Sequence, residues 1–160
     1  MKRPSTIFLK TTLFVMAGAL LAFCIFAIPA ISRGVGVEWP HLAHLEYPIL
    51  IGGYLTAIPF FIALYQAFKL LGYIDKNTAF SELSVKALKY IKYCGIAMSV
   101  LYVAGLPLLF QIADADDAPG LVAIGLVLAV APLVVSVFAA VLQKLVQNAI
   151  DIKSENDLTV

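Results

Sequence analysis

The sequence predicts an all-α integral membrane protein, a bundle of four membrane-spanning helices, and three observations carry this prediction. Hydrophobic residues make up 62% of the 160 residues. Charged residues make up only 13%, whereas soluble domains typically carry ~25%. Four apolar runs, residues 11–31, 48–68, 94–112 and 120–142, contain no Asp, Glu, Lys, Arg or His. Each is close to the ~20 residues that a helix needs to cross a ~30 Å hydrocarbon core.

The first run, residues 11–31, is expected to remain as a membrane span. Its apolar length exceeds the ~7–15 residues of a signal-peptide core, and Pro29 falls at the best candidate for a cleavage site. The four spans then account for most of the chain, so we expect a single transmembrane domain over residues 1–160. A loop at residues 69–93 and a tail at residues 143–160 are the longest segments outside the spans.

The basic residues predict the orientation. Every Lys and Arg except Arg33 lies before the first run, between the second and third, or after the fourth. Because short basic loops stay in the cytoplasm, both termini are predicted to be cytoplasmic, with the protein in a plasma membrane. The loop 69–93 and the tail 143–160 are then cytoplasmic as well.

Small residues four positions apart occur in every run and favour close packing of helices. These pairs are Gly18 with Ala22, Gly53 with Ala57, Gly95 with Ser99, and Gly125 with Ala129. Hydroxyl groups within the spans, such as those of Ser99 and Ser136, are expected to bridge helices. Prolines at 29, 59, 107 and 132 predict kinks. Their arrangement repeats in the two halves of the chain, which suggests a duplicated helical hairpin.

The spans offer no catalytic group. Ser99 and Ser136 have no His, Asp or Glu within a span to activate them, so we expect no enzyme activity. Cys24 and Cys94 lack the Cys-x-x-Cys spacing of metal or redox sites, and we expect no cofactor. Ion-coupled carriers normally place ionisable groups inside the membrane, and these runs have none.

The two outer loops hold the histidines and the densest group of carboxylates, which makes them weak candidates for a cation site. The residues are His41, His44, Asp114, Asp116 and Asp117. Imidazole suits zinc, and carboxylates suit calcium. An acidic outer face also simply accompanies a basic inner face, and Asp117 is placed to cap the fourth helix.

Two amphipathic segments extend the spans on the basic side. Residues 77–81 predict a turn followed by the start of a helix. Apolar residues from Phe80 to Ile91 then recur at helical spacing, and Lys86, Lys89 and Lys92 follow one another at three-residue intervals. The tail 143–160 also has an apolar and a polar face. Two roles are consistent with both segments: they lie in the headgroup region of the membrane and anchor the protein there, or they bind a cytosolic protein. The residues that we expect to contact such a partner are Phe80, Leu83, Lys86, Lys89, Leu158 and Val160.

The turn Asp75-Lys76-Asn77-Thr78-Ala79-Phe80-Ser81 and the ending Glu155-Asn156-Asp157-Leu158-Thr159-Val160 resemble a bacterial family of four-span proteins. This is the YoaS-like family, described as domain of unknown function 2975. The resemblance covers essentially the whole chain. It implies no active site. Because members are often encoded beside a small helix-turn-helix regulator, it implies a cytosolic partner of that kind.

Three functions remain open at this point. The leading hypothesis is a membrane sensor or tether that binds a cytosolic helix-turn-helix regulator, without direct contact to nucleic acid. A small carrier, or a carrier subunit, for a hydrophobic or toxic compound is the second, and a wide polar-lined cavity would favour it. A structural membrane subunit is the third. The sequence leaves open whether the chain forms an oligomer.

Overall fold

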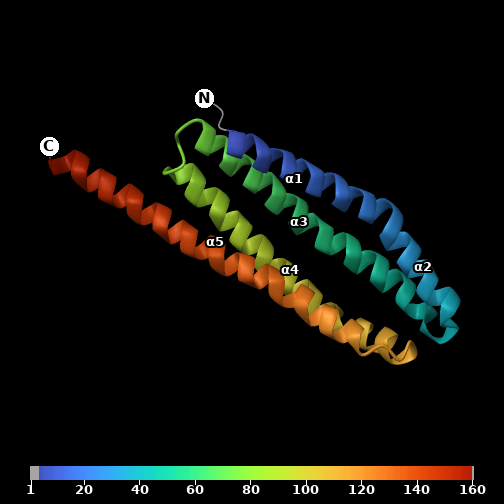
Figure 1. The fold of residues 1–160 in the computed structure, drawn as a ribbon. Helices are drawn as coiled ribbons and strands as arrows, with labels where there is room; N and C mark the ends of the chain where they lie inside the picture. The colour runs from blue at the N-terminus through green and yellow to red at the C-terminus, as the bar shows by residue number, and fades with distance from the viewer. Residues whose placement is uncertain (1–3, 160) are drawn as a thin grey trace.

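The structure, a computed structural model, describes residues 4–159 and is helical along almost all of that length (Figure 1). It confirms the all-α prediction: no strand occurs between residues 4 and 159. The elements in chain order are α1 (Pro4–Ala22), the π-helical segment η1 (Phe23–Ala27), α2 (Ile28–Glu38), the 3-10 turn η2 (Pro40–Leu45), α3 (Glu46–Asp75), α4 (Glu82–Ala115) and α5 (Gly120–Thr159).

These elements form four long rods, each long and apolar enough to cross a membrane. They cover Pro4–Glu38, Pro40–Asp75, Glu82–Ala115 and Gly120–Leu158, so every rod is longer than the apolar run that predicted it. Large apolar side chains cover their outer surfaces; Phe26 is 73% exposed and Phe138 is 65% exposed. Such extended apolar surface is not seen on soluble monomers, whereas a bilayer solvates it.

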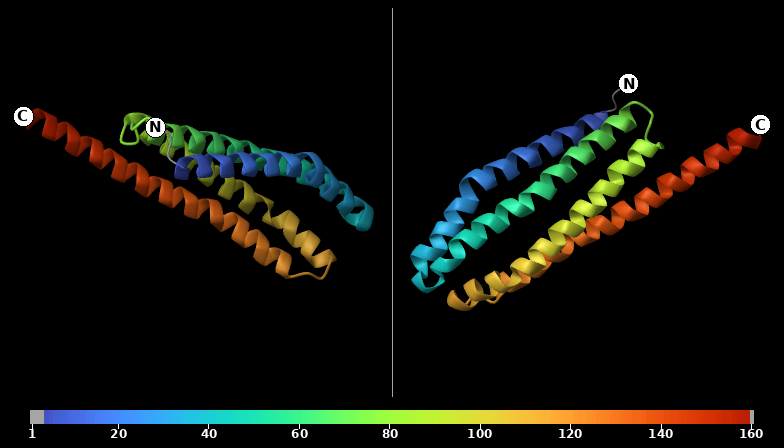
Figure 2. Two further views of the ribbon diagram at one scale, coloured as in Figure 1. Left: turned by 45° about the horizontal axis from the view of Figure 1, so that its top comes forward. Right: turned by 180° about the vertical axis from the view of Figure 1, so that it is seen from behind.

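The rods pack in chain order. The first rod, α1 to α2, lies on α3; α3 lies on α4; and α4 lies on α5 (Figure 2). One end of the molecule holds the start of α1, the end of α5 and the α3–α4 turn, together with lysines on all four rods, and we refer to it as the basic end. The opposite end, the acidic end, holds η2 and the α4–α5 turn with Glu38, Glu46, Asp114, Asp116 and Asp117.

The same turn geometry ends α3 and α4. Asn77 (φ 58°) and Asp117 (φ 48°) adopt the left-handed conformation that follows the last helical residue in a Schellman motif. The amide of Thr78 donates to the Tyr73 carbonyl, and the amide of Ala118 donates to the Ala113 carbonyl. Asp117 therefore closes α4, and the expectation that it caps the fourth helix is wrong. The turn predicted at residues 77–81 is confirmed, since α4 begins at Glu82.

The α4–α5 pair is joined through small residues. Gly95 faces Ser136 and the Pro132 carbonyl so closely that a Cβ atom at Gly95 would lie 2.6 Å from that oxygen. The Ser99 hydroxyl donates to the Ala129 carbonyl at 2.6 Å. The Ser136 hydroxyl donates to the Lys92 carbonyl at 2.8 Å. These contacts confirm that serines bridge helices.

Of the four small-residue pairs, the one in α1 is not at a helix contact. A Cβ atom at Gly18 would meet nothing within 4 Å. At the other three pairs, Gly53 lies against Ile28, Gly95 lies against α5, and Gly125 lies against Leu109. The spacing therefore predicted close packing correctly in α3, α4 and α5 and wrongly in α1.

Candidate functional site

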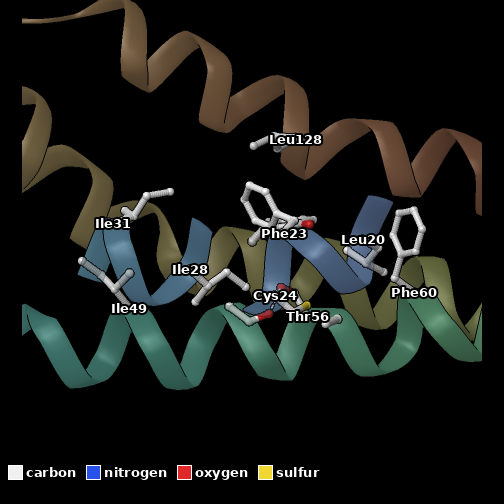
Figure 3. A pocket seen from close by; sticks show the side chains of 12 residues that line it. Leu20, Phe23, Cys24, Ile28, Ile31, Ile49, Thr56, Phe60 and Leu128 are labelled. Carbon is white, nitrogen blue, oxygen red and sulfur yellow. Dashed lines mark hydrogen bonds between the residues drawn. The ribbon is translucent and has the colours of Figure 1, made fainter. Parts of the chain in front are cut away.

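An apolar groove runs along the face of α3 and α4, between the first rod and α5. It consists of two adjoining cavities of about 310 and 270 Å³. Figure 3 shows how side chains from the first rod, α3 and α5 converge on the larger cavity. The residues that line both cavities are Ile31, Ile49, Gly53, Thr56, Tyr102 and Leu128. Sequence analysis did not identify this site, because it depends on how the rods pack.

The lining of the groove is almost entirely hydrocarbon. Thr56 and Tyr102 are its polar side chains, and the Thr56 hydroxyl already donates to the Gly53 carbonyl at 2.9 Å. A carrier was expected to show a wide, polar-lined cavity, and this groove has the opposite character. An apolar ligand matches the groove, because polar groups would be buried here without partners.

One wall of the groove is built from a break in the first rod. At η1 the amide of Ile28 donates to the Phe23 carbonyl, five residues back, so the helix takes a π-helical turn. Pro29 follows directly and has no amide hydrogen to donate. The Cys24 carbonyl is therefore left without either of its usual backbone donors. A π-helical turn of this kind often occurs at functional sites.

A tyrosine on the neighbouring rod satisfies that carbonyl. The Tyr54 hydroxyl of α3 donates to the Cys24 carbonyl at 3.0 Å. Since an unsatisfied carbonyl at membrane depth is costly, Tyr54 stabilises the π-helical turn and fixes the first rod against α3. Cys24 itself is 7% exposed and packs with Ile28 and Ala57.

At the basic end an ion pair ties α1 to α3. Lys10 Nζ lies 2.9 Å from Asp75 Oδ2, with only 19% and 8% of the two side chains exposed. The ammonium group also lies 5.4 Å from the centre of the Phe68 ring. Phe14 in turn packs edge-on against Phe68, at 5.3 Å between ring centres. Sequence analysis assigned no role to this pair.

The expected partner-binding residues lie on the surface of the basic end, but not on one patch. Phe80 and Leu83 are 66% and 54% exposed, and Lys86 and Lys89 are exposed one and two turns further along α4. The apolar face of this part of α4 that packs inside the protein consists of Ala87 and Leu88.

The C-terminal residues lie further out. Gln147 of α5 contacts Glu82 at the start of α4, at 3.4 Å. Leu158, which is 83% exposed, follows Gln147 by about 16 Å along the helix axis. The structure therefore separates Leu158 from Phe80 and Leu83. Val160 lies outside the described residues.

The weak cation-site candidates do not come together. In η2 the side chains of Leu42 and Leu45 are buried and leave His41 and His44 exposed on the opposite face. Asp114, Asp116 and Asp117 are exposed at the neighbouring turn. Among residues 4–159 no group of three or more His, Cys, Asp or Glu side chains is placed to hold a metal ion.

Comparisons with known proteins agree with the resemblance found in the sequence. The model of the family described as "Protein of unknown function (DUF2975)" matches residues 33–160. The chain is also 56% identical over 160 residues to "Uncharacterized membrane protein YoaS" from Bacillus subtilis (strain 168), with all of both chains covered. No solved structure matches the chain. The chain is thus a multi-pass membrane protein and belongs to the DUF2975 family.

Proposed function

We propose that the protein is a membrane-embedded sensor or tether that binds a cytosolic helix-turn-helix regulator at its basic end. This proposal includes the orientation predicted from the lysines, with both termini in the cytoplasm. The regulator as partner is implied by the family resemblance. The projecting end of α5 is the observation that supports a binding role.

The projecting segment comprises residues 148–159, the part of α5 beyond Gln147. It rises about 18 Å past the contact between Gln147 and Glu82, and Figure 1 shows it extending away from the other helices. Residues 151–158 are all exposed. Two of them, Ile152 (64%) and Leu158 (83%), are large and apolar. On the aqueous side of a membrane, such a helix leaves apolar surface in water.

The energetics of this segment favour a bound partner. The segment continues α5 and needs no separate nucleus, but most helical stability in proteins comes from tertiary packing, and the side chains of residues 151–158 are all exposed. A protein that packs against Ile152 would bury apolar surface at ~25 cal/mol per Å² and hold the segment helical. Phe80 and Leu83 offer a second apolar contact surface near Gln147, where the projecting segment begins. Lys86 and Lys89 are exposed further along α4.

The test is co-isolation from membranes. We would express the full-length chain together with a helix-turn-helix regulator of the kind that the family resemblance implies, solubilise the membranes and measure how much regulator is recovered with the chain. Ending the chain after Lys153, or changing Ile152→Asp, should remove most of the recovered regulator, because each removes apolar contact surface. The Phe80→Asp and Leu83→Asp variants should weaken recovery as well.

Val37→Asp is the matched control. Val37 is 82% exposed at the acidic end, so this variant adds the same charge on the opposite side of the membrane and should bind as the parent chain does. Full recovery with both the chain ending after Lys153 and the Ile152→Asp variant would contradict the docking role of the segment, since the first lacks Leu158 and the second lacks the apolar side chain at position 152. Recovery of a membrane protein in place of the regulator would favour the structural-subunit hypothesis. Access of an antibody to a C-terminal tag on intact cells would contradict the orientation.

We propose no catalytic role. The hydroxyls of Ser99 and Ser136 donate to backbone carbonyls of the facing helix, which gives both serines a structural function. A nucleophile would need a base within hydrogen-bond reach instead.

A further inference from the structure

We propose that the apolar groove binds one acyl chain of a phospholipid whose headgroup carries an amine and lies at the acidic end. This proposal does not depend on the regulator, since it concerns a different surface and the opposite end of the molecule. It assigns a ligand class to the groove between the first rod and α5.

The position of the groove gives a lipid chain direct access. The rods pack in chain order, so the first rod and α5 form two opposite walls, and the groove is open to the side between them. Its lining residues belong to the membrane-spanning parts of all four rods. Lipid can therefore enter laterally from the bilayer without crossing a polar surface.

The length of the groove matches a single leaflet. On α3 the lining residues run from Pro48 at the acidic end to Phe60, which corresponds to about 18 Å of helix. Half of a ~30 Å hydrocarbon core is ~15 Å. The groove therefore extends from the membrane surface at the acidic end to near the bilayer midplane, as an acyl chain of that leaflet does.

The shape of the groove suits a linear occupant. Its two cavities, of about 310 and 270 Å³, adjoin one another along the rods. The hydrocarbon lining and this elongated form match an acyl chain. A helix of a second copy of the chain is the alternative occupant that the test below distinguishes.

The charge at the acidic end selects the headgroup. Five described carboxylates lie there, and Arg33 is the one described Lys or Arg at that end. An anionic headgroup would be repelled, while an ammonium group is attracted. Tyr47 directly precedes the lining residue Pro48, and Trp39 packs against the same buried cluster as the lining residue Ile49. Both aromatic side chains thus lie near the mouth of the groove, at the level where such rings favour lipid headgroups.

Photolabelling of the full-length chain tests the proposal. The protein is reconstituted with a trace of phosphatidylethanolamine that carries a photoreactive group midway along one acyl chain. Labelled peptides are identified by mass spectrometry. We expect labels to concentrate on Phe23, Ile49, Tyr102 and Leu128, the groove residues of the four rods. Labels should be several-fold sparser on the outer residues Phe26 and Phe138, which exchanging bilayer lipid contacts.

Two glycines allow the groove to be filled without a clash. Gly52 and Gly105 line it, and a Cβ atom at either position meets nothing within 4 Å. In the Gly52→Leu/Gly105→Leu variant we expect groove labelling to fall about tenfold or more, because the new side chains take the volume that the ligand needs. Gly34→Leu is the matched control, since Gly34 also faces open space and lies outside the groove.

Competition separates the headgroups. Unlabelled phosphatidylethanolamine should suppress groove labelling at lower concentrations than phosphatidylglycerol with the same acyl chains. Equal suppression would overturn the headgroup assignment. Labels spread evenly around all four rods, or unchanged groove labelling in the double variant, would overturn the binding site. The melting temperature of every variant is measured as well, so that labelling is compared only between folded proteins. Crosslinking of two copies through groove residues would also overturn the proposal.

Discussion

The two helical hairpins of this protein are held together by different means. In the α4–α5 hairpin, glycine and serine bring the two backbones together, and the serine hydroxyls donate to backbone carbonyls of the facing helix. The hairpin of the first rod and α3 uses long side chains: the Lys10–Asp75 ion pair, the Phe14–Phe68 contact and the Tyr54 hydroxyl. The first hairpin thus depends on contacts between long side chains, and the second depends on the close approach of two backbones.

This difference predicts that added volume harms α4–α5 most. The Gly95→Leu variant should lower the free energy of unfolding by about 3 kcal/mol or more, because its side chain must displace Ser136 and the Pro132 backbone. Unfolding in mixed micelles, followed by circular dichroism, measures the effect. Gly18→Leu is the control on α1, where nothing lies within 4 Å, and it should leave stability nearly unchanged. Equal stability of the two variants would contradict close packing at Gly95.

Removing charge should instead affect the hairpin of α1 and α3. Lys10→Met or Asp75→Leu alone should cost about 2–3 kcal/mol, since each leaves the other charge mostly buried. The double variant should recover most of that loss, because two apolar side chains replace the pair. Lys69→Met is the control, as its ammonium group lies 5.5 Å from the centre of the Tyr65 ring and forms no ion pair within residues 4–159. Additive losses in the double variant would show that the two charges act independently.

The smallest expected difference compares two hydroxyls. Tyr54→Phe leaves the Cys24 carbonyl without a donor and should cost about 1–2 kcal/mol. Ser99→Ala should cost only ~0.6 kcal/mol, because the Ala129 carbonyl also has its own donor within α5. The same unfolding measurement, applied to both variants, shows which hydroxyl contributes more to the free energy of unfolding. An unchanged free energy of unfolding for Tyr54→Phe would mean that the π-helical turn does not need the Tyr54 hydroxyl.

The number of spans was predictable because it depends on composition alone. Each apolar run is long enough for a bilayer, so four rods follow without any knowledge of packing. The small residues Gly95 and Gly125 also predicted close contacts, since backbones approach only where side chains are absent. The same pattern failed at Gly18, because it does not tell which face of a helix meets a neighbour.

The groove and the contacts of the first hairpin could not be predicted from the sequence, because they depend on how the rods pack against one another. Lys10 and Asp75 are 65 positions apart, and their pairing requires the register between α1 and α3. Pro29 predicted a kink, yet the π-helical turn before it depends on Tyr54 from another rod. The histidines and aspartates looked like a cluster because both loops are short and polar, whereas helix packing keeps them from forming one group.

The length of α5 determines how the binding of a partner should depend on salt concentration. The Debye length is about 8 Å at physiological salt, and Leu158 lies about 16 Å beyond Gln147. A protein held at the tip of α5 would lie about two Debye lengths from the level of Gln147, so Lys86 and Lys89 would hardly act on it there. Raised salt should weaken contacts that a partner's carboxylates make with Lys86 and Lys89, and should leave the apolar contact with Leu158 largely in place. Salt therefore distinguishes the two points of attachment.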